Sequence, residues 1–446
     1  MLTDVLPRPP AITRAEYHQR RDTLMAQLLT NAAVILPGGS LVTRSNDSEY
    51  TFRQSSDFYY LTGISEPDAL LVLLPGREAG QSVVFCQDRD PTMEAWTGRR
   101  LGAQGVITAH GIDQAFENAE REAMMPELLA GRELLYLPLD HDGALDIAEE
   151  ALSQAKAGQR RGLPALKGWM DVNPLIHAMR QIKSEAEIAL LRHATAISAH
   201  AHVRAMCTAR PGLSEYQLQA ELEHEFVWQG GSGPAYSTIV GGGANACVLH
   251  YIENSAPLAD GELVLIDAGA EFELYAGDIT RTFPVSGRFN DAQRALYQVV
   301  LHAQERAVAA IQPGVTLADI HKGVVADLTA GLIELGLLEG ELQTCIDEQH
   351  YRRFYLHSTS HWLGLDVHDV GTYRLNADTP RPLEPGMVLT VEPGLYIPDE
   401  TDIPVAYRGI GIRIEDNVVV TNQGHEVLTD QVPKRVADIE ALMASD

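Results

Sequence analysis

The sequence predicts an α/β protein of the mixed α+β type with two domains, an N-terminal α/β domain over residues 1–178 and a second domain over residues 179–446. In the first part of the chain, short apolar runs alternate with helical patterns. Between Asp171 and Lys183 this alternation of patterns ends, and the start signal of a new helix follows. We place the domain boundary there. The second part contains two similar nine-residue segments, which indicate a pseudo-twofold repeat.

In the N-terminal domain, the first helix is expected to open at Thr13, with Glu16 completing a capping box. Strand-like runs and helical stretches follow, as expected for a compact α/β domain. The strands are predicted at residues 33–36, 69–74 and 83–86, and a helix is predicted at residues 115–129.

In the second domain, Ser184 and Glu187 form another capping box, which opens a long amphipathic helix through Ile197. Three more helices are expected, and the last of them should end near Gly336. Their predicted starts are Ser214 with Gln217 at the third position, the neighbourhood of Asp291, and Thr316.

The repeat joins residues 261–269 to residues 386–394. In each segment an apolar run ends in a carboxylate, Asp267 or Glu392, six residues after one Gly and two before another. A second carboxylate follows each of them, Asp278 in the first case and Glu415 in the second. Two similar half-domains that face each other would bring both acid pairs to one central cleft.

The amino-acid composition argues against some classes of binding partner and some classes of site. The chain has 34 basic and 61 acidic residues and a net charge of −27, which argues against nucleic acid or an anionic membrane. Its four cysteines form no Cys-x-x-Cys pair, so neither a disulfide framework nor a thiolate zinc site is expected. No apolar signal-like region opens the chain and no apolar run reaches about 18 residues, so we expect a cytoplasmic location.

Five residues have the chemistry of a two-metal site. A single acid at the end of an apolar strand could instead cap the following turn, but the joint occurrence of four acids and one histidine in matched contexts favours metal binding. A buried carboxylate that keeps its charge needs a partner, and two divalent cations would balance four of them. Hard oxygen donors and one imidazole suit Mn²⁺, with Co²⁺, Fe²⁺ or Zn²⁺ as alternatives. The five residues are Asp267, Asp278, His361, Glu392 and Glu415.

The motifs around these residues resemble those of aminopeptidase P, the Xaa-Pro aminopeptidase. They include residues 249–251, 267–269, 277–284, 361–371, 392–394 and 409–416, and in the N-terminal part residues 47–50, 53–63 and 96–102. The resemblance implies a creatinase/aminopeptidase P type N-terminal domain followed by a pita-bread catalytic domain. It also implies that Asp278 and Glu415 bridge the two metals, that Asp267 binds one of them, and that His361 and Glu392 complete the other.

The resemblance assigns further roles around the metals. His250 and His368 would donate hydrogen bonds to the substrate carbonyl or to the oxyanion, or they are structural histidines. His357 would lie at the substrate or serve in packing. Arg413 would hold a ligand carboxylate, and Glu392 would also accept the proton of the attacking water.

Three positions carry open alternatives. Ser358 stands where family members often have Gly, which would change substrate fit. Trp96 either lies near a neighbouring subunit's active site or is a buried core residue, and Asp47 either reaches a partner's cleft or lies in a surface loop.

The expected function is hydrolysis of the bond between an N-terminal residue and a following proline, with two divalent ions per subunit. The expected partners are Xaa-Pro peptides, and the protein is expected to form a homodimer or homotetramer. A prolidase that cleaves Xaa-Pro dipeptides is the nearest alternative. A non-catalytic binding protein on the same fold is a second alternative, which the complete set of five candidate ligands argues against.

Overall fold

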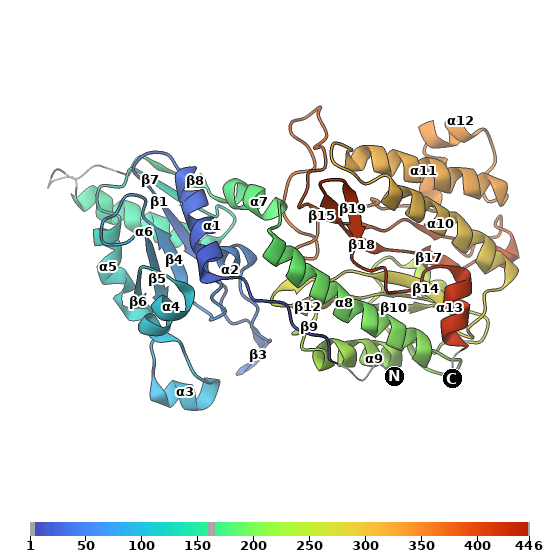
Figure 1. Cartoon of the computed structure of the whole chain (residues 1–446), viewed down its shortest axis with the longest axis horizontal. Helices are drawn as coiled ribbons and strands as arrows, with labels where there is room; N and C mark the ends of the chain where they lie inside the picture. Colours follow the sequence, from blue (N-terminus) through green and yellow to red (C-terminus); the bar gives the residue numbers. More distant parts are fainter. Residues whose placement is uncertain (1–4, 159–161, 163–165, 445–446) are drawn as a thin grey trace. The chain divides into compact units, whose positions relative to one another are not determined.

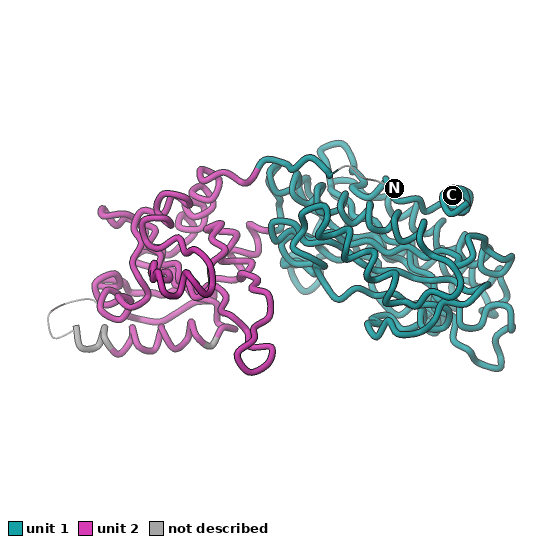
Figure 2. The backbone as a smooth tube through the Cα atoms, turned by 90° about the horizontal axis from the view of Figure 1, so that it is seen from below, with its two compact units in different colours: residues 1–10, 181–446 teal, residues 11–180 magenta. Residues whose placement is uncertain are grey.

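The computed structural model (Figure 1) describes residues 5–158, 162 and 166–444, and the chain forms two compact units (Figure 2). One unit spans residues 11–180, and the other combines residues 1–10 with residues 181–446. The first ten residues therefore group with the second unit, although the sequence analysis assigned them to the N-terminal domain. Contacts explain this: the Leu6 N–H donates to Gln229 Oε1 at 2.9 Å, and the Arg8 guanidinium lies 5.6 Å from the Phe272 ring centroid.

The N-terminal unit is built on a six-stranded mixed sheet in the order β6-β5-β4-β1-β7-β8. Its strands are β1 (Ala32–Pro37), β4 (Leu70–Leu73), β5 (Ser82–Cys86), β6 (Gln114–Glu117), β7 (Leu134–Leu137) and β8 (Gly168–Asp171), with a separate hairpin of β2 (Thr43–Ser45) and β3 (Ser48–Glu49). Its helices are α1 (Arg14–Ala26), α2 (Ser56–Thr62), α3 (Pro91–Thr97), α4 (Gly102–His110), α5 (Arg121–Leu128), α6 (Asp142–Gly158) and α7 (Asn173–Gln181).

Most expected elements of this unit are present. Thr13 caps α1, because its hydroxyl accepts from the Glu16 N–H at 3.2 Å, and the three predicted strands are β1, β4 and β5. The helix predicted at residues 115–129 was wrong in its first part, where β6 pairs in parallel with β5 and the Phe116 ring packs 5.8 Å from that of Phe85. Sheet pairing overrides the helical pattern there, and α5 begins only at Arg121.

The second unit places strands between two pairs of long helices. Its helices are α8 (Glu185–Thr208), α9 (Glu215–Trp228), α10 (Asp291–Ala309), α11 (Leu317–Glu334), α12 (Leu342–Asp347) and α13 (Val436–Met443). Its strands are β9 (Gly233–Pro234), β10 (Ile239–Gly242), β11 (Leu263–Asp267), β12 (Ala270–Phe272), β13 (Tyr275–Ala276), β14 (Thr280–Pro284), β15 (Val388–Val391), β16 (Gly394–Tyr396), β17 (Gly411–Arg413), β18 (Asp416–Thr421) and β19 (Gly424–Val427).

The helix starts in this unit agree with the sequence. Capping boxes are present at Ser184 and Ser214, Asn290 caps α10 and Thr316 caps α11. Helix α8 runs to Thr208 instead of ending at Ile197, because a buried face of small and apolar residues continues and no proline interrupts the chain before Pro211.

The internal repeat corresponds to two similar halves. In the first, α8 and α9 accompany the antiparallel pair β11–β14, and in the second, α10 and α11 accompany the antiparallel pair β15–β18 (Figure 1). Main-chain contacts join the halves, since the Glu415 N–H donates to Thr280 O at 3.0 Å. Both halves therefore deliver their strand ends to the same region.

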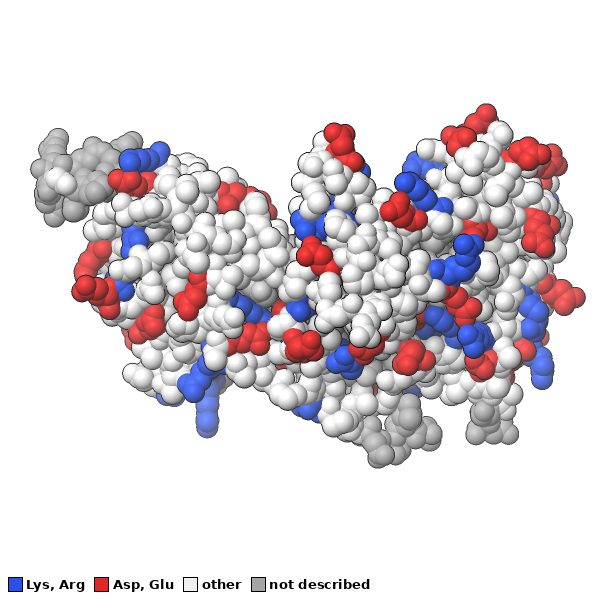
Figure 3. All heavy atoms as spheres, turned by 45° about the horizontal axis from the view of Figure 1, so that its top comes forward, with Lys and Arg blue, Asp and Glu red and all other residues white. Residues whose placement is uncertain are grey.

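The surface carries charge of both signs. On the face shown in Figure 3, acidic and basic side chains are interspersed, and the basic ones do not gather into one continuous patch. Of the helices in the described residues, none combines the length and the apolar character required to cross a bilayer.

Candidate active site and metal centre

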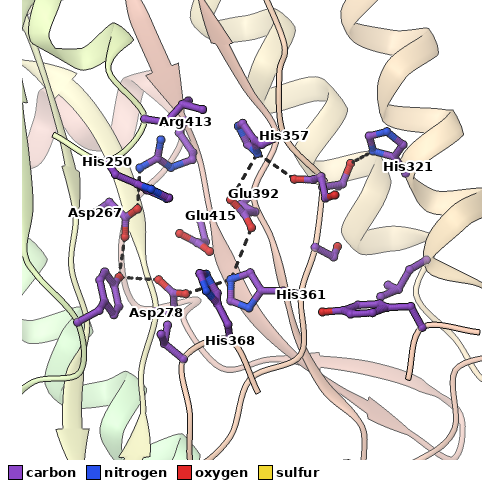
Figure 4. A pocket seen from close by; sticks show the side chains of 18 of the residues that line it. His250, Asp267, Asp278, His321, His357, His361, His368, Glu392, Arg413 and Glu415 are labelled. Atoms are coloured by element: carbon purple, nitrogen blue, oxygen red, sulfur yellow. Dashed lines mark hydrogen bonds and ion pairs between the residues drawn. The ribbon is translucent and has the colours of Figure 1, made fainter. Parts of the chain in front are cut away.

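A cavity of about 920 Å³ opens in the second unit, and every residue that lines it belongs to that unit. Its size is near the upper end of the range for small-molecule pockets, about 300–1,000 Å³. Nine of the ten predicted site residues line this cavity, and Figure 4 shows them converging from strands and from the loops that follow or join strands: His250, Asp267, Asp278, His357, His361, His368, Glu392, Arg413 and Glu415.

The ends of strands position the four acids. Asp267 is the last residue of β11 and pairs with Thr280 of β14, so Asp278 lies just before the neighbouring strand. Glu392 directly follows β15, and Glu415 lies between β17 and β18. The sequence repeat predicted that both acid pairs would reach one cleft, and all four acids line the same cavity.

The distances fit a metal site. Ligand atoms of Asp278, His361 and Glu415 all lie within 4.8 Å of one another. His361 Nε2 lies 3.3 Å from Asp278 Oδ2 and 3.6 Å from Glu392 Oε1. The other ring nitrogen, Nδ1, faces the carbonyl oxygen of Trp362 at 2.9 Å, so Nε2 is directed at the acids.

Burial makes these acids hold protons more tightly than usual. Asp278 is 4% exposed and Glu415 is 2% exposed. Burial, followed by repulsion from neighbouring carboxylates, raises the pKa of Glu415 well above its usual value. Burial likewise raises the pKa of Asp278 and raises that of Glu392 to about 7. Burial alone would lower the pKa of His361, but the hydrogen bond and charge of Asp278 raise it to about 9. The residues present therefore fit divalent cations, whose charge would favour the ionised acids.

Arg413 and Tyr236 form hydrogen bonds with Asp267, the fourth acid of the cavity. Arg413 Nη2 donates to Asp267 Oδ2 at 2.6 Å, and Nη1 donates to the Tyr396 hydroxyl at 2.9 Å. The Tyr236 hydroxyl lies 2.6 Å from Asp267 Oδ1 and 2.5 Å from Asp278 Oδ1. Tyr236 was not predicted from the sequence, because it lies 31 residues before the first acid and no motif marks it.

Three histidines surround the cluster. The His368 ring packs edge-on against the His361 ring, with centroids 4.5 Å apart, and burial lowers its pKa. His357 Nε2 lies 2.8 Å from the Tyr396 hydroxyl, and burial lowers the His357 pKa to about 4. His250 is exposed in the wall of the cavity. The rings of His357 and His368 are therefore available as neutral hydrogen-bond partners beside the acids.

Comparison with known proteins identifies the family. The family model described as "Metallopeptidase family M24" matches residues 189–422. The model described as "Aminopeptidase P, N-terminal domain" matches residues 17–136. This chain belongs to metallopeptidase family M24. Its catalytic domain has the pita-bread fold, and the combination of domains is that of aminopeptidase P, so the protein is an enzyme of a family that uses divalent metal ions.

Individual relatives agree with this family assignment over nearly the whole chain. The chain is 46% identical to an Escherichia coli Xaa-Pro aminopeptidase, over 97% of this chain and 98% of that protein. It is 35% identical to a human Xaa-Pro aminopeptidase 3, over 97% of this chain and 86% of that protein. The structure of Pseudomonas aeruginosa aminopeptidase PepP matches with a TM-score of 0.96 and 47% identity, covering 98% of this chain and 99% of that one.

The tenth predicted site residue of this M24 enzyme lies outside the cavity. Trp96 is in α3 of the N-terminal unit and is 83% exposed, so its alternative assignment as a buried core residue is wrong. Asp47 is exposed between β2 and β3 in that unit, in the surface loop that was its simpler assignment. Ser358 lines the cavity.

Proposed function

We propose that this M24 enzyme removes the N-terminal residue from peptides whose second residue is proline. The observation that supports this proposal is the convergence of five ligand-type side chains, two of them buried and three half-buried, in one cavity of about 920 Å³. The Escherichia coli relative, nearly half of whose residues are identical, is named for this activity.

Two divalent ions would be held by Asp267, Asp278, His361, Glu392 and Glu415, all of which line the cavity. The donor set of four carboxylates and one imidazole favours Mn²⁺, and Co²⁺, Zn²⁺ or Fe²⁺ are alternatives. When bound, such ions supply a Lewis acid for the scissile carbonyl and lower the pKa of water.

The protein side chains have distinct tasks in this proposal. His250 and His368 donate hydrogen bonds to the oxygen that gains charge as the carbonyl is attacked. Glu392 accepts the proton of the attacking water on a carboxylate oxygen. Arg413, through its 2.6 Å hydrogen bond, holds the Asp267 carboxylate in its orientation. His357 packs behind Glu392, 3.6 Å from its carboxylate, and contacts the substrate.

Prolidase activity is the second candidate. The relatives and the match to the aminopeptidase P N-terminal domain favour aminopeptidase P over prolidase. A binding protein without activity is disfavoured, because the five ligand-type side chains are all present and lie in one cavity.

The test measures release of the free N-terminal residue from an Xaa-Pro-Yaa tripeptide by EDTA-treated protein, with and without Mn²⁺. An Xaa-Ala-Yaa tripeptide and an Xaa-Pro dipeptide are the matched controls. We expect Mn²⁺-dependent release from the proline tripeptide, with less from either control. A folded protein that releases nothing with any of the four metals would overturn the proposal, and preference for the dipeptide would assign a prolidase.

We also propose that the enzyme acts in the cytoplasm as a homodimer or homotetramer. The exposed Trp96 side chain supports a role in an assembly, where it would approach the substrate bound to a neighbouring subunit. Light scattering of the purified protein gives the mass of the assembly.

A further inference from the structure

Helix α11 contributes one polar side chain to the cavity, His321. It lies beside the apolar lining residues Leu317 and Ala318, near the start of the helix. In Figure 4 His321 is on the opposite side of the view from Asp267. It lies apart from the five candidate ligands and has no part in the function proposed above.

A chain of hydrogen bonds fixes the orientation of this ring. His321 Nδ1 lies 2.8 Å from the Thr359 hydroxyl oxygen, which lies 2.9 Å from the Tyr355 hydroxyl oxygen. Tyr355 is 1% exposed and Thr359 is 2% exposed, so water does not compete for these groups. Within the described part of the chain, Thr359 is the hydrogen-bond partner of the Tyr355 hydroxyl.

The direction of the chain follows from the need to satisfy buried polar hydrogens. The phenol hydrogen of Tyr355 has to be donated to Thr359, since it would otherwise be buried without an acceptor. The Thr359 hydroxyl then donates its own hydrogen to His321 Nδ1. Nδ1 is therefore an acceptor, and the proton of the neutral imidazole is on Nε2. Burial lowers the pKa of His321, which agrees with a neutral ring.

The Nε2–H group of His321 is free for a ligand, because no partner for it is present among the described residues. A neutral N–H donor in the wall of a cavity recognises a carbonyl or carboxylate oxygen. A peptide offers such oxygens at every residue.

The charge of the cavity determines which part of a peptide reaches His321. All acidic residues of the lining belong to the four-carboxylate cluster, which attracts the free amino group. Because only one residue is removed, the scissile bond must also lie at that cluster. The residues after the proline then extend along the remaining wall, to which α11 contributes Leu317, Ala318 and His321.

We propose that His321 is a specificity-determining residue that donates a hydrogen bond from Nε2 to a main-chain or terminal carboxylate oxygen of the residue following the proline. This inference rests on the proposed function and adds a contact that a dipeptide cannot make. It predicts that the enzyme binds Xaa-Pro-Yaa more tightly than Xaa-Pro through this one side chain.

The experiment compares the wild-type enzyme with His321→Phe, which keeps an aromatic ring and removes the donor. For an Xaa-Pro-Yaa tripeptide we expect KM to rise about 5- to 10-fold, the size expected for one lost hydrogen bond, with kcat within about twofold. The inhibition constant of the Xaa-Pro dipeptide should change by less than about twofold. Equal changes for both peptides, or no change for either, would overturn the inference.

Two further variants separate substrate contact from structure. His321→Gln keeps an N–H donor of similar reach, so its KM should return towards the wild-type value. Thr359→Val removes the hydroxyl that fixes the tautomer, so it should raise the tripeptide KM in the wild-type background and add nothing in His321→Phe. If Gln fails to restore KM while melting temperatures are unchanged, His321 does not bind the substrate. If the wild-type enzyme does not cleave the tripeptide at all, the proposed function is refuted instead.

Discussion

Glu415 and Asp416 are adjacent in the chain and both are buried, yet their surroundings have opposite effects. Glu415 faces the cavity, where burial and then Asp278 and Glu392 raise its pKa well above the usual value. Asp416 accepts from Arg281 Nη2 at 2.7 Å and from Gln304 Nε2 at 2.8 Å, and it also pairs with Lys434. Burial alone would raise the Asp416 pKa, but Arg281 and Lys434 outweigh it and hold that pKa well below the usual range.

The difference in their charged neighbours distinguishes an acid with a structural role from an acid that is a candidate metal ligand. The Asp416 network has two cationic side chains for one carboxylate, so its charge is balanced within the protein. Four carboxylates line the cavity, and among the described residues one guanidinium, that of Arg413, pairs with them. Divalent cations would balance the remaining charge, which is the electrostatic basis for locating the metals there.

The substitution Glu415→Gln tests the cavity side of this comparison and should have the largest effect. It keeps the shape of the side chain and removes one ligand charge, so kcat/KM should fall by about 100-fold or more, with less metal bound per subunit. The metal-free protein should be at least as stable as the wild type, because the folded state no longer has to hold a buried carboxyl group, charged or protonated, at this position. Metal analysis, the tripeptide assay and urea unfolding in EDTA measure these quantities. A fully active, metal-loaded variant would break the comparison.

The substitution Asp416→Asn tests the other side and should reverse the pattern. It leaves Arg281 buried without its anionic partner, so the free energy of unfolding should fall by about 3 kcal/mol. Metal content and activity per folded molecule should stay within a few-fold of wild type. Urea unfolding at neutral pH measures the loss, with Glu415→Gln as the matched neighbour. If both variants lose metal and stability together, the two acids form one network, contrary to the comparison.

The sequence predicted the acids of the cavity better than the residues around them. The four acids could be predicted because each follows or borders an apolar run, and such a run is visible in the local sequence. They are Asp267, Asp278, Glu392 and Glu415. Tyr236 and Arg281 were not, because their partners lie 31 and 135 residues away and only the folded sheets bring them together. His321 was missed for the same reason, since its contact with Thr359 joins residues 38 positions apart.

Local pattern also failed where tertiary pairing decides the conformation. Residues 114–117 form β6 although the helix was predicted to begin at residue 115, because they pair in parallel with β5. Residues 5–10 have no periodic pattern, so nothing local indicated that Leu6 would contact Gln229 or that Arg8 would contact Phe272.

Asp57, a half-buried acid in the N-terminal unit, extends the comparison to a third carboxylate. It contacts His177 Nε2 at 3.1 Å and Arg180 Nη1 at 2.7 Å, which links α2 to α7. Burial alone would raise its pKa, but His177 and Arg180 lower it, so Asp57 belongs to the same class as Asp416.

A lowered pKa in the folded state contributes stability above the unfolded value of about 3.9, and this contribution is lost as pH falls below it. We therefore expect Asp57→Asn to destabilise the α2–α7 region by about 2 kcal/mol at pH 7 and by progressively less as pH falls towards 3. Hydrogen exchange of α2 and α7, measured in both proteins across this range, gives the local difference, and a difference that does not vary with pH would show that the Asp57 charge is not its source.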